Sequence, residues 1–166
     1  MREMEWAPAR GGAELLIDGQ RLTARRLSGL GQTLISGDLD AAIADLAPGA
    51  PMLGLYALAP EGAHGLRIGR TSALLVTPAP LTTAEGWRDG WCATSVDDAW
   101  AAVEVSGEDA GNALMQATSA DLASGSPSAA ALIFGLRGLL VRTAPGFRVH
   151  VESSWLETLL TWLDGA

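Results

Sequence analysis

The sequence predicts an α+β fold in which a mostly antiparallel sheet packs against a few helices. Three observations lead to this prediction. Strand-like segments outnumber helical ones, glycine and proline end them at short intervals, and a strand–turn–helix–strands order occurs twice. The 166 residues, 48% hydrophobic and 18% charged, fit one compact domain that needs neither disulfides nor metal to fold.

The first half of the chain, about residues 1–80, contains one helical pattern among several strand-like runs. Leu39, Ile43 and Leu46 share one helical face, and Pro48-Gly49 ends that helix. The other predicted elements of this half are a hairpin over 13–26 with its turn at Asp18-Gly19, a strand over 52–59, and a strand over 66–76 that ends before Pro78 and Pro80.

A connecting stretch, about residues 79–98, separates this half from the second, about residues 99–166. The C-terminal helix has the clearest local signal, because Ser154 and Glu157 form a capping-box pattern before an apolar stripe. The other predicted elements are a strand over 100–105, a helix over 110–117 capped by Ser106 and Asp109, strands over 129–136 and 138–142, and a strand over 147–151 whose solvated face carries Arg148, His150 and Glu152.

Two short similarities relate the halves. The residues 35–38, Ile-Ser-Gly-Asp, precede the first helix, and 105–108, Val-Ser-Gly-Glu, precede the second. The residues 65–68, Gly-Leu-Arg-Ile, match 146–149, Gly-Phe-Arg-Val. An internal duplication is one interpretation and chance similarity is the other, so two pseudo-repeated halves stay an open alternative.

Composition excludes several classes of function. The formal net charge is −8 and none of the 11 basic residues is lysine, which argues against nucleic-acid binding, Schiff-base chemistry and a Walker-type phosphate loop. One cysteine, Cys92, and two separated histidines, His64 and His150, do not supply a zinc site. No apolar run reaches membrane-spanning length and the N-terminus lacks a secretory pattern, so we expect a cytoplasmic protein outside the membrane.

Tryptophan is the compositional anomaly, with six residues against one tyrosine and two phenylalanines. Trp87 and Trp91 lie in a polar segment, and Trp162 lies off the apolar stripe of the last helix, whereas Trp155 fits the core. Because tryptophan is enriched where proteins bind one another, we predict Trp87, Trp91 and Trp162 as interface residues, with core burial as the alternative. Five arginines on predicted strands are weaker candidates for polar contacts: Arg67, Arg70, Arg137, Arg142 and Arg148.

The second half resembles a known family. The residues 95–97 (Ser-Val-Asp), 101–110 (Ala-Ala-Val-Glu-Val-Ser-Gly-Glu-Asp-Ala), Leu114 and 121–122 (Asp-Leu) resemble the strand–turn–helix of the aminomethyltransferase folate-binding domain. The gamma subunit of heterotetrameric sarcosine oxidase is more similar, since it ends in a Phe-x-Val-x-Val strand and a Ser-to-Trp-Leu helix like those at 147–151 and 154–163. In the first half, 66–69 and 74–76 match the family loosely, without its Asp-Glu-Trp centre.

The resemblance implies a folate-binding-domain-like fold without the transferase chemistry. The transferases place an aspartate near the folate, and the corresponding residues here, 135–141, offer leucine instead. No catalytic residue and no metal site are therefore predicted. The family implies a non-catalytic gamma-type subunit that serves the assembly and stability of a sarcosine-oxidase-like complex, with the alpha subunit as its main partner.

In that family FAD, FMN and NAD belong to the larger subunits, so this chain is expected to bind no cofactor of its own. The alternative is a stand-alone protein of the same fold that binds tetrahydrofolate or another small molecule. A third interpretation is a small enzyme whose site the sequence does not reveal.

Overall fold

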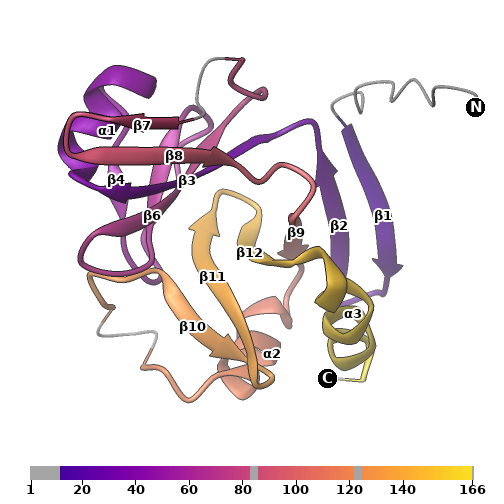
Figure 1. Ribbon diagram of the computed structural model, residues 1–166. Coiled ribbons are helices and arrows are strands. Elements are labelled where there is room, and N and C mark those ends of the chain that lie inside the picture. The colour runs from indigo at the N-terminus through magenta and orange to yellow at the C-terminus, as the bar shows by residue number, and fades with distance from the viewer. Residues whose placement is uncertain (1–11, 83–85, 122–124, 166) are drawn as a thin grey trace, which may run out of the picture.

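The computed structural model describes residues 12–82, 86–121 and 125–165 and arranges them as two six-stranded β-sheets with helices outside (Figure 1). The N-terminal residues 1–11, where no secretory pattern was predicted, lie outside the described residues, as does Leu122. The elements in chain order are β1 (Gly12–Asp18), β2 (Thr23–Ser28), β3 (Gly31–Gly37), α1 (Leu39–Leu46), β4 (Met52–Leu53), β5 (His64–Arg67), β6 (Ser72–Thr77), β7 (Gly86–Arg88), β8 (Trp91–Ser95), β9 (Trp100–Ser106), α2 (Ala110–Ala117), β10 (Ala130–Ile133), β11 (Leu136–Thr143), β12 (Gly146–Glu152), the 3₁₀ turn η1 (Ser153–Trp155) and α3 (Leu156–Asp164).

The two sheets have the same strand order, although β4 is parallel to β5 while its counterpart β10 is antiparallel to β11. Sheet I has the strand order β7-β8-β3-β6-β5-β4, and sheet II has the order β1-β2-β9-β12-β11-β10. Each strand of one sheet thus matches the strand six places away in the chain. The pairings β2 with β9 and β8 with β3 show that the halves exchange their first hairpins. The fold is α+β with mostly antiparallel sheets, as predicted, and among the named strands that the structure describes only β4 and β5 pair in parallel.

The exchanged hairpins contact equivalent strand-to-helix turns. Gly37 and Gly107 both have positive φ, at 102° and 110°. A Cβ at Gly37 would lie 2.2 Å from the Gly90 carbonyl oxygen in the β7–β8 turn, and one at Gly107 would lie 2.3 Å from the Arg21 oxygen in the β1–β2 turn. Both turns need glycine because backbone approaches backbone there.

Only one of the two sequence similarities between the halves lies at equivalent places in the two sheets. The Ser-Gly turns at 36–37 and 106–107 lie at equivalent places, before α1 and α2. Gly65 lies on β5 and Gly146 on β12, and these strands are not equivalent, since β12 matches β6. The first similarity therefore falls on equivalent positions of the two sheets and the second does not.

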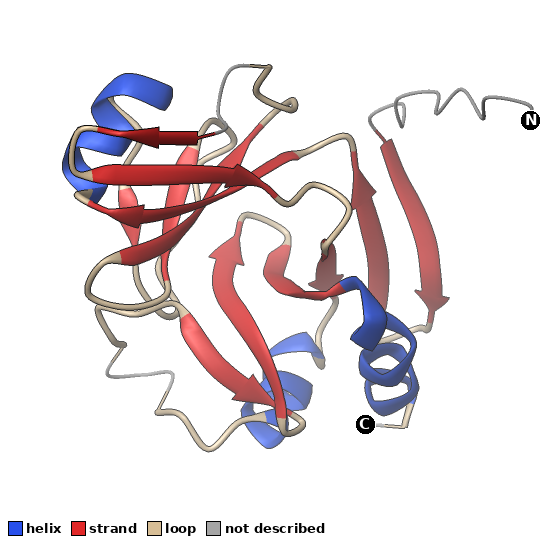
Figure 2. Ribbon diagram, in the orientation of Figure 1, coloured by secondary structure: helices blue, strands red, loops and turns tan. Residues whose placement is uncertain are grey.

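Three apolar layers hold the sheets and helices together. Helix α1 covers the outer face of sheet I, and α2 and α3 cover that of sheet II (Figure 2). The inner faces pack against each other through leucines and valines. The inner apolar layer consists of Leu53, Leu66, Leu74, Val76, Ala129, Leu139 and Val141.

Several elements differ locally from the prediction. The segment 52–59 forms only a two-residue strand, because Gly54 lies against the Ser126 carbonyl and Tyr56 has a positive φ of 61°. The segment 66–76 is a hairpin of β5 and β6 rather than one strand. The connecting stretch 79–98 contains β7 and β8, joined by Asp89-Gly90, a two-residue hairpin turn.

The predicted caps differ as well. Helix α1 is capped by Asp38, whose side chain accepts a hydrogen bond from the Ala41 amide. Helix α2 has Asp109 at its N-cap without a side-chain cap, since that carboxylate binds Arg21 at 2.7 Å. Helix α3 is preceded by the turn η1, so the predicted capping box of Ser154 and Glu157 does not form. Each helix itself is confirmed.

Candidate functional site

A polar cluster lies buried between the two sheets. His150, on β12, is fully buried, and its Nδ1 lies 2.8 Å from Gln32 Oε1 on β3. Gln32 Nε2 donates to the Trp100 carbonyl at 2.7 Å. His64, the first residue of β5, is also buried, and its Nδ1 lies 2.8 Å from the Gly62 carbonyl. The face of β12 that the alternation predicted to be solvated is therefore an inner face covered by sheet I.

The hydrogen bonds fix the tautomers of both histidines. The Gly62 carbonyl and Gln32 Oε1 can only accept, so each Nδ1 carries a proton and each Nε2 keeps a lone pair. Both Nε2 atoms are buried without a hydrogen-bond partner among the described residues. Burial is the main cause that lowers the pKa of His150 to about 3, and the electrostatic interaction with Arg148, and with His64 when that ring is protonated, adds to it.

Burial likewise lowers the pKa of His64, although the hydrogen bond to Gly62 opposes this shift. Burial also lowers the pKa of Arg148, although the negative charge of the nearby Glu104 opposes that shift. Arg148 Nη2 and Glu104 Oε2 lie 3.9 Å apart on adjacent strands. His150 is thus neutral at physiological pH and sealed from solvent. No group of three or more His, Cys, Asp or Glu in 12–82, 86–121 and 125–165 could hold a metal ion.

The segment 135–141, which the resemblance to the transferases singled out, is apolar except for Arg137. Gly135 and Phe134 form the two-residue turn between β10 and β11, with positive φ at both positions, as a type I′ turn requires. On β11, Leu139 and Val141 point into the layer between the sheets, and Leu140 points toward the helices. Leucine and valine have no group that takes a proton or holds an ammonium.

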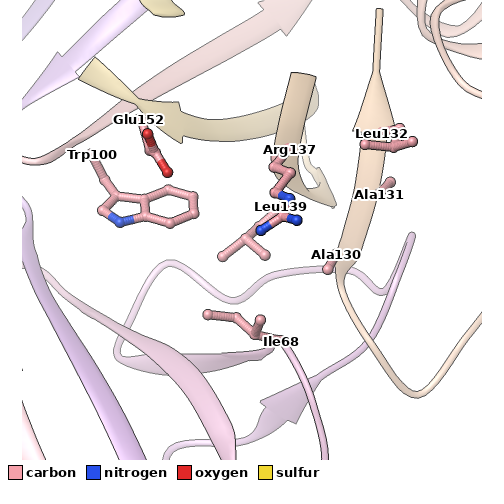
Figure 3. Close-up of a pocket in the computed structure, with 9 residues that line it drawn as sticks. Ile68, Trp100, Ala130, Ala131, Leu132, Arg137, Leu139 and Glu152 are labelled. Atoms are coloured by element: carbon pink, nitrogen blue, oxygen red, sulfur yellow. The ribbon is translucent and has the colours of Figure 1, made fainter. Parts of the chain in front are cut away.

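An open groove of about 470 Å³ lies beside this strand (Figure 3). Leu139 and Ile68 form its apolar floor, and the Trp100 ring lies at one side with Glu152 above it. Arg137 lies across the groove from Trp100. The remaining residues that line the groove are Ala130, Ala131, Leu132 and Gly138.

The register of sheet II explains why these side chains share one face. Leu132 pairs with Arg137, and Glu152 pairs with Trp100, so the four form a cross-strand row on β10, β11, β12 and β9. Gly138 pairs with Val151, which places Arg137 opposite Glu152 on adjacent strands. Neither charge takes part in an ion pair among the residues that the structure describes.

Large apolar side chains remain exposed around the β10–β11 hairpin. Leu132 is 55% exposed and Trp162 is 54% exposed. Trp162 stacks on Phe134 at the hairpin tip, with ring centroids 5.6 Å apart. Trp155 and Met115, on the elements beside the hairpin, are exposed as well. We call Leu132, Trp155, Trp162 and Met115 the hairpin patch; a monomer gains nothing from exposing such a group, which is typical of an interaction surface.

The predicted interface tryptophans have different environments. Trp87 on β7 is 75% exposed, whereas Trp91, four residues on, is 4% exposed in the core beneath α1. The interface prediction for Trp91 is thus corrected, because the hairpin turn directs its ring to the inside of the chain. Trp155, predicted to be in the core, is 46% exposed, since η1 displaces it from the stripe of α3. The interface role of Trp87 and Trp162 stays a prediction.

The candidate arginines are not brought together. Arg137 lines the groove, while Arg148 pairs with Val141 of the layer between the sheets and is largely buried. The Arg142 guanidinium lies 5.1 Å from the centre of the Tyr56 ring, and Arg67 donates to the Arg70 carbonyl. Sequence reasoning missed Trp100 and Glu152 as groove residues, because their alignment depends on which strands become neighbours.

Comparison with known proteins finds similarity in structure alone. No family model matches the chain, and no curated protein matches it in sequence. The fold belongs to the class in which two helix-covered sheets pack together and each half of the chain contributes its first hairpin to the sheet of the other half. Among solved structures, a chain of the heterotetrameric sarcosine oxidase from Corynebacterium sp. U-96, solved in complex with pyrrole 2-carboxylate, has this fold.

That similarity has a TM-score of 0.72 at 18% sequence identity and covers 89% of this chain and 84% of the other. The predicted likeness in fold to a sarcosine oxidase subunit is therefore confirmed. None of the helices among the described residues is long and apolar enough to cross a membrane.

Proposed function

We propose that this chain is a non-catalytic, gamma-type subunit of a sarcosine-oxidase-like complex, in which it serves assembly and stability. The observation that carries the proposal is the shared fold over most of both chains. In this proposal the complex demethylates sarcosine oxidatively to glycine and passes the one-carbon unit to tetrahydrofolate. FAD, FMN and NAD belong to the larger subunits, the alpha-type subunit is the main partner, and the complex works in the cytoplasm.

Two features of the chain support a role in assembly. The hairpin patch presents four large apolar side chains, of which Leu132 also lines the open groove. Within 135–141, the segment that the resemblance aligns with the transferase aspartate, Leu139 to Val141 are buried and apolar. A surface for a partner and a centre without reactive groups are what an accessory subunit requires.

Reconstitution tests the proposal. The chain is co-expressed with the alpha-type and other large oxidase subunits of the same genome, and the product is sized by light scattering. We expect one stable assembly that contains this chain and oxidises sarcosine, and that loses stability when the chain is omitted. Assembly and full heat stability of the large subunits without this chain, and no association with it, would overturn the proposal.

The patch provides a matched pair of variants. Trp162→Ala removes an exposed ring of the hairpin patch, and Leu15→Ala removes an exposed apolar side chain on β1, at the opposite edge of sheet II. We expect the first to weaken the assembly at least tenfold and the second to leave it unchanged. Circular dichroism of each isolated variant controls for folding.

The alternative, a folate-binding protein, is tested with the same material. Trp100 lines the groove, so a bound pterin would quench its fluorescence. The groove is open to solvent along Leu132 and Arg137, which suits a protein partner better than an enclosed small molecule. We expect no saturable quenching by tetrahydrofolate; saturable quenching would favour the alternative.

A further inference from the structure

We propose that the free edge of β10 binds an extended apolar segment of a partner protein as a seventh strand of sheet II, with one bulky apolar side chain of that segment in the adjacent groove. The proposal rests on the proposed function, because the partner is a larger subunit of the same complex. It adds the surface, the mode of binding and the chemistry of the segment.

The two sheets have four edge strands, and three of them carry features that prevent pairing with another chain. β1 has a register irregularity between Leu15 and Ile17, and it bears two carboxylates, Glu14 and Asp18. β4 has only two residues, and β7 has three and ends at Arg88. β10, Ala130–Ile133, has neither charge nor proline within it, and its pairing with β11 is regular.

The hairpin geometry shows which backbone groups of β10 are open. The two-residue turn makes Ile133 and Leu136 a hydrogen-bonded pair, and the bond from the Leu140 amide to the Ala129 carbonyl has the same phase. Ala130 and Leu132 therefore direct their amide and carbonyl groups away from β11. The Ala130 amide accordingly binds the Ser128 hydroxyl, at 3.2 Å.

The Leu132 amide, the Leu132 carbonyl and the Ala130 carbonyl have no hydrogen-bond partner in the part of the chain that the structure describes. These three groups suit the backbone of one added strand. Both residues are exposed, so the edge is accessible.

The side chains of the same two residues line the groove, so an added strand would run along it. A side chain of that strand would lie between the Trp100 ring and Leu132, above Leu139 and Ile68. The unpaired charges of Arg137 and Glu152 at the rim suit polar groups on either side of that apolar residue. An apolar pocket beside an open edge is the arrangement by which strand addition obtains both affinity and specificity.

A second copy of the chain suits this edge poorly. Each copy has a formal net charge of −8, so two copies repel each other. If a second copy paired through its own β10, it would bring only Ala130 and Leu132 to the edge. In each copy these two side chains already form the wall of that copy's own groove. A larger partner with its own apolar segment is the occupant that the observations favour.

Proline at Leu132 gives a direct test, because the Leu132 amide points away from β11. Leu132→Pro removes the donor that the added strand needs without removing a bond of the β10–β11 ladder. Leu132→Thr shortens the side chain and keeps the amide. We expect the proline variant to bind the co-expressed large subunits at least tenfold more weakly than the threonine variant, with both folded by circular dichroism.

A second measurement does not depend on substitution. In the isolated chain the Leu132 amide should exchange its hydrogen rapidly, while the Ala131 and Ile133 amides, bound to β11, exchange slowly. On formation of the complex the Leu132 amide should become protected. Ala130→Phe, which fills the groove from its own wall, should weaken the complex as well.

The outcomes separate the two proposals. No complex of the large subunits with the unaltered chain would overturn the proposed function and, with it, strand addition. A complex in which the Leu132 amide still exchanges rapidly and Leu132→Pro binds like Leu132→Thr would overturn strand addition alone. A dimer of the isolated chain, seen by sedimentation and abolished by Leu132→Pro, would show a second copy as the occupant and overturn the proposed partner.

Discussion

Sheets I and II have the same strand order but differ at the strand farthest from the exchanged hairpin, which is parallel to its neighbour in sheet I and antiparallel in sheet II. In sheet I this strand is β4, which has two residues, and the chain that follows it is tied down where Leu55 donates to the Ser126 and Ser128 carbonyls. In sheet II it is β10, which is longer, regular and open beside a groove. The comparison teaches that one architecture can supply a closed edge for stability and an open edge for binding.

The hairpins that the halves exchange are also equivalent, and each has an ion pair to a helical segment. Arg21 binds Asp109 at the start of α2, and Arg88 binds Asp45 in α1 at 2.8 Å. All four side chains are substantially exposed, so each pair contributes less than about 1 kcal/mol. The β7–β8 hairpin is therefore held on sheet I by its buried side chains and not by the ion pair of Arg88.

The largest expected effect comes from the two tryptophans of that hairpin. Trp91→Ala should destabilise the fold by about 3–5 kcal/mol, because it leaves a cavity beneath α1. Trp87→Ala, only four residues away, should change the free energy of unfolding by less than about 0.5 kcal/mol, since the ring is mostly exposed. Urea denaturation of both variants measures the difference. Equal losses would mean that β7 and β8 do not pack as described.

The equivalent turns should be equally sensitive. Gly37→Ala and Gly107→Ala should each destabilise the chain by about 3 kcal/mol or more, because the new Cβ meets a backbone oxygen in a left-handed conformation. Gly49 has a positive φ of 83° with no atom within 4 Å of the added Cβ, so Gly49→Ala should cost only about 1–2 kcal/mol.

Denaturation curves of the three glycine variants separate the two contributions to their cost. The Gly49 variant reports backbone strain, and the excess in the other two reports the hairpin contact. If one of Gly37→Ala and Gly107→Ala lowered the free energy of unfolding no more than Gly49→Ala does, the exchanged hairpin would be in close contact with the turn in one half only.

The dependence of stability on pH sharpens the comparison at the layer that both sheets share. In the unfolded chain His150 takes up a proton near pH 6.5, whereas the pKa of about 3 keeps it neutral in the fold. The unfolded state therefore binds more protons between these values. Stability should fall as the pH is lowered below about 6.5, by about 1.4 kcal/mol per pH unit for this group alone.

His150→Asn keeps a donor toward Gln32 and removes the titration. Its stability should depend on pH less steeply between pH 6.5 and 4 than that of the unaltered chain. His64, whose pKa is also lowered, accounts for the slope that remains. An unchanged slope in the asparagine variant would show that the layer between the sheets admits water to His150.

Local signals predicted much of this fold. The spacing of Leu39, Ile43 and Leu46 and the strand at 100–105 were read correctly because they depend on neighbours in sequence. The solvated face expected for His150 was wrong, because alternation shows that a strand has two faces but not what covers the second one. The groove escaped prediction for the same reason, since Trp100 and Glu152 become neighbours only through the β9–β12 pairing.

The exchange of hairpins has a consequence during synthesis on the ribosome. β2 finds its permanent neighbour only when β9 has emerged, which takes several seconds at about 5–20 residues per second. Until then the nascent N-terminal region exposes a two-stranded ribbon, which is marginally stable alone. Neither sheet can therefore be completed until strands from both halves are available, and a gene cut between its halves would yield two polypeptides that each lack a hairpin of their own sheet.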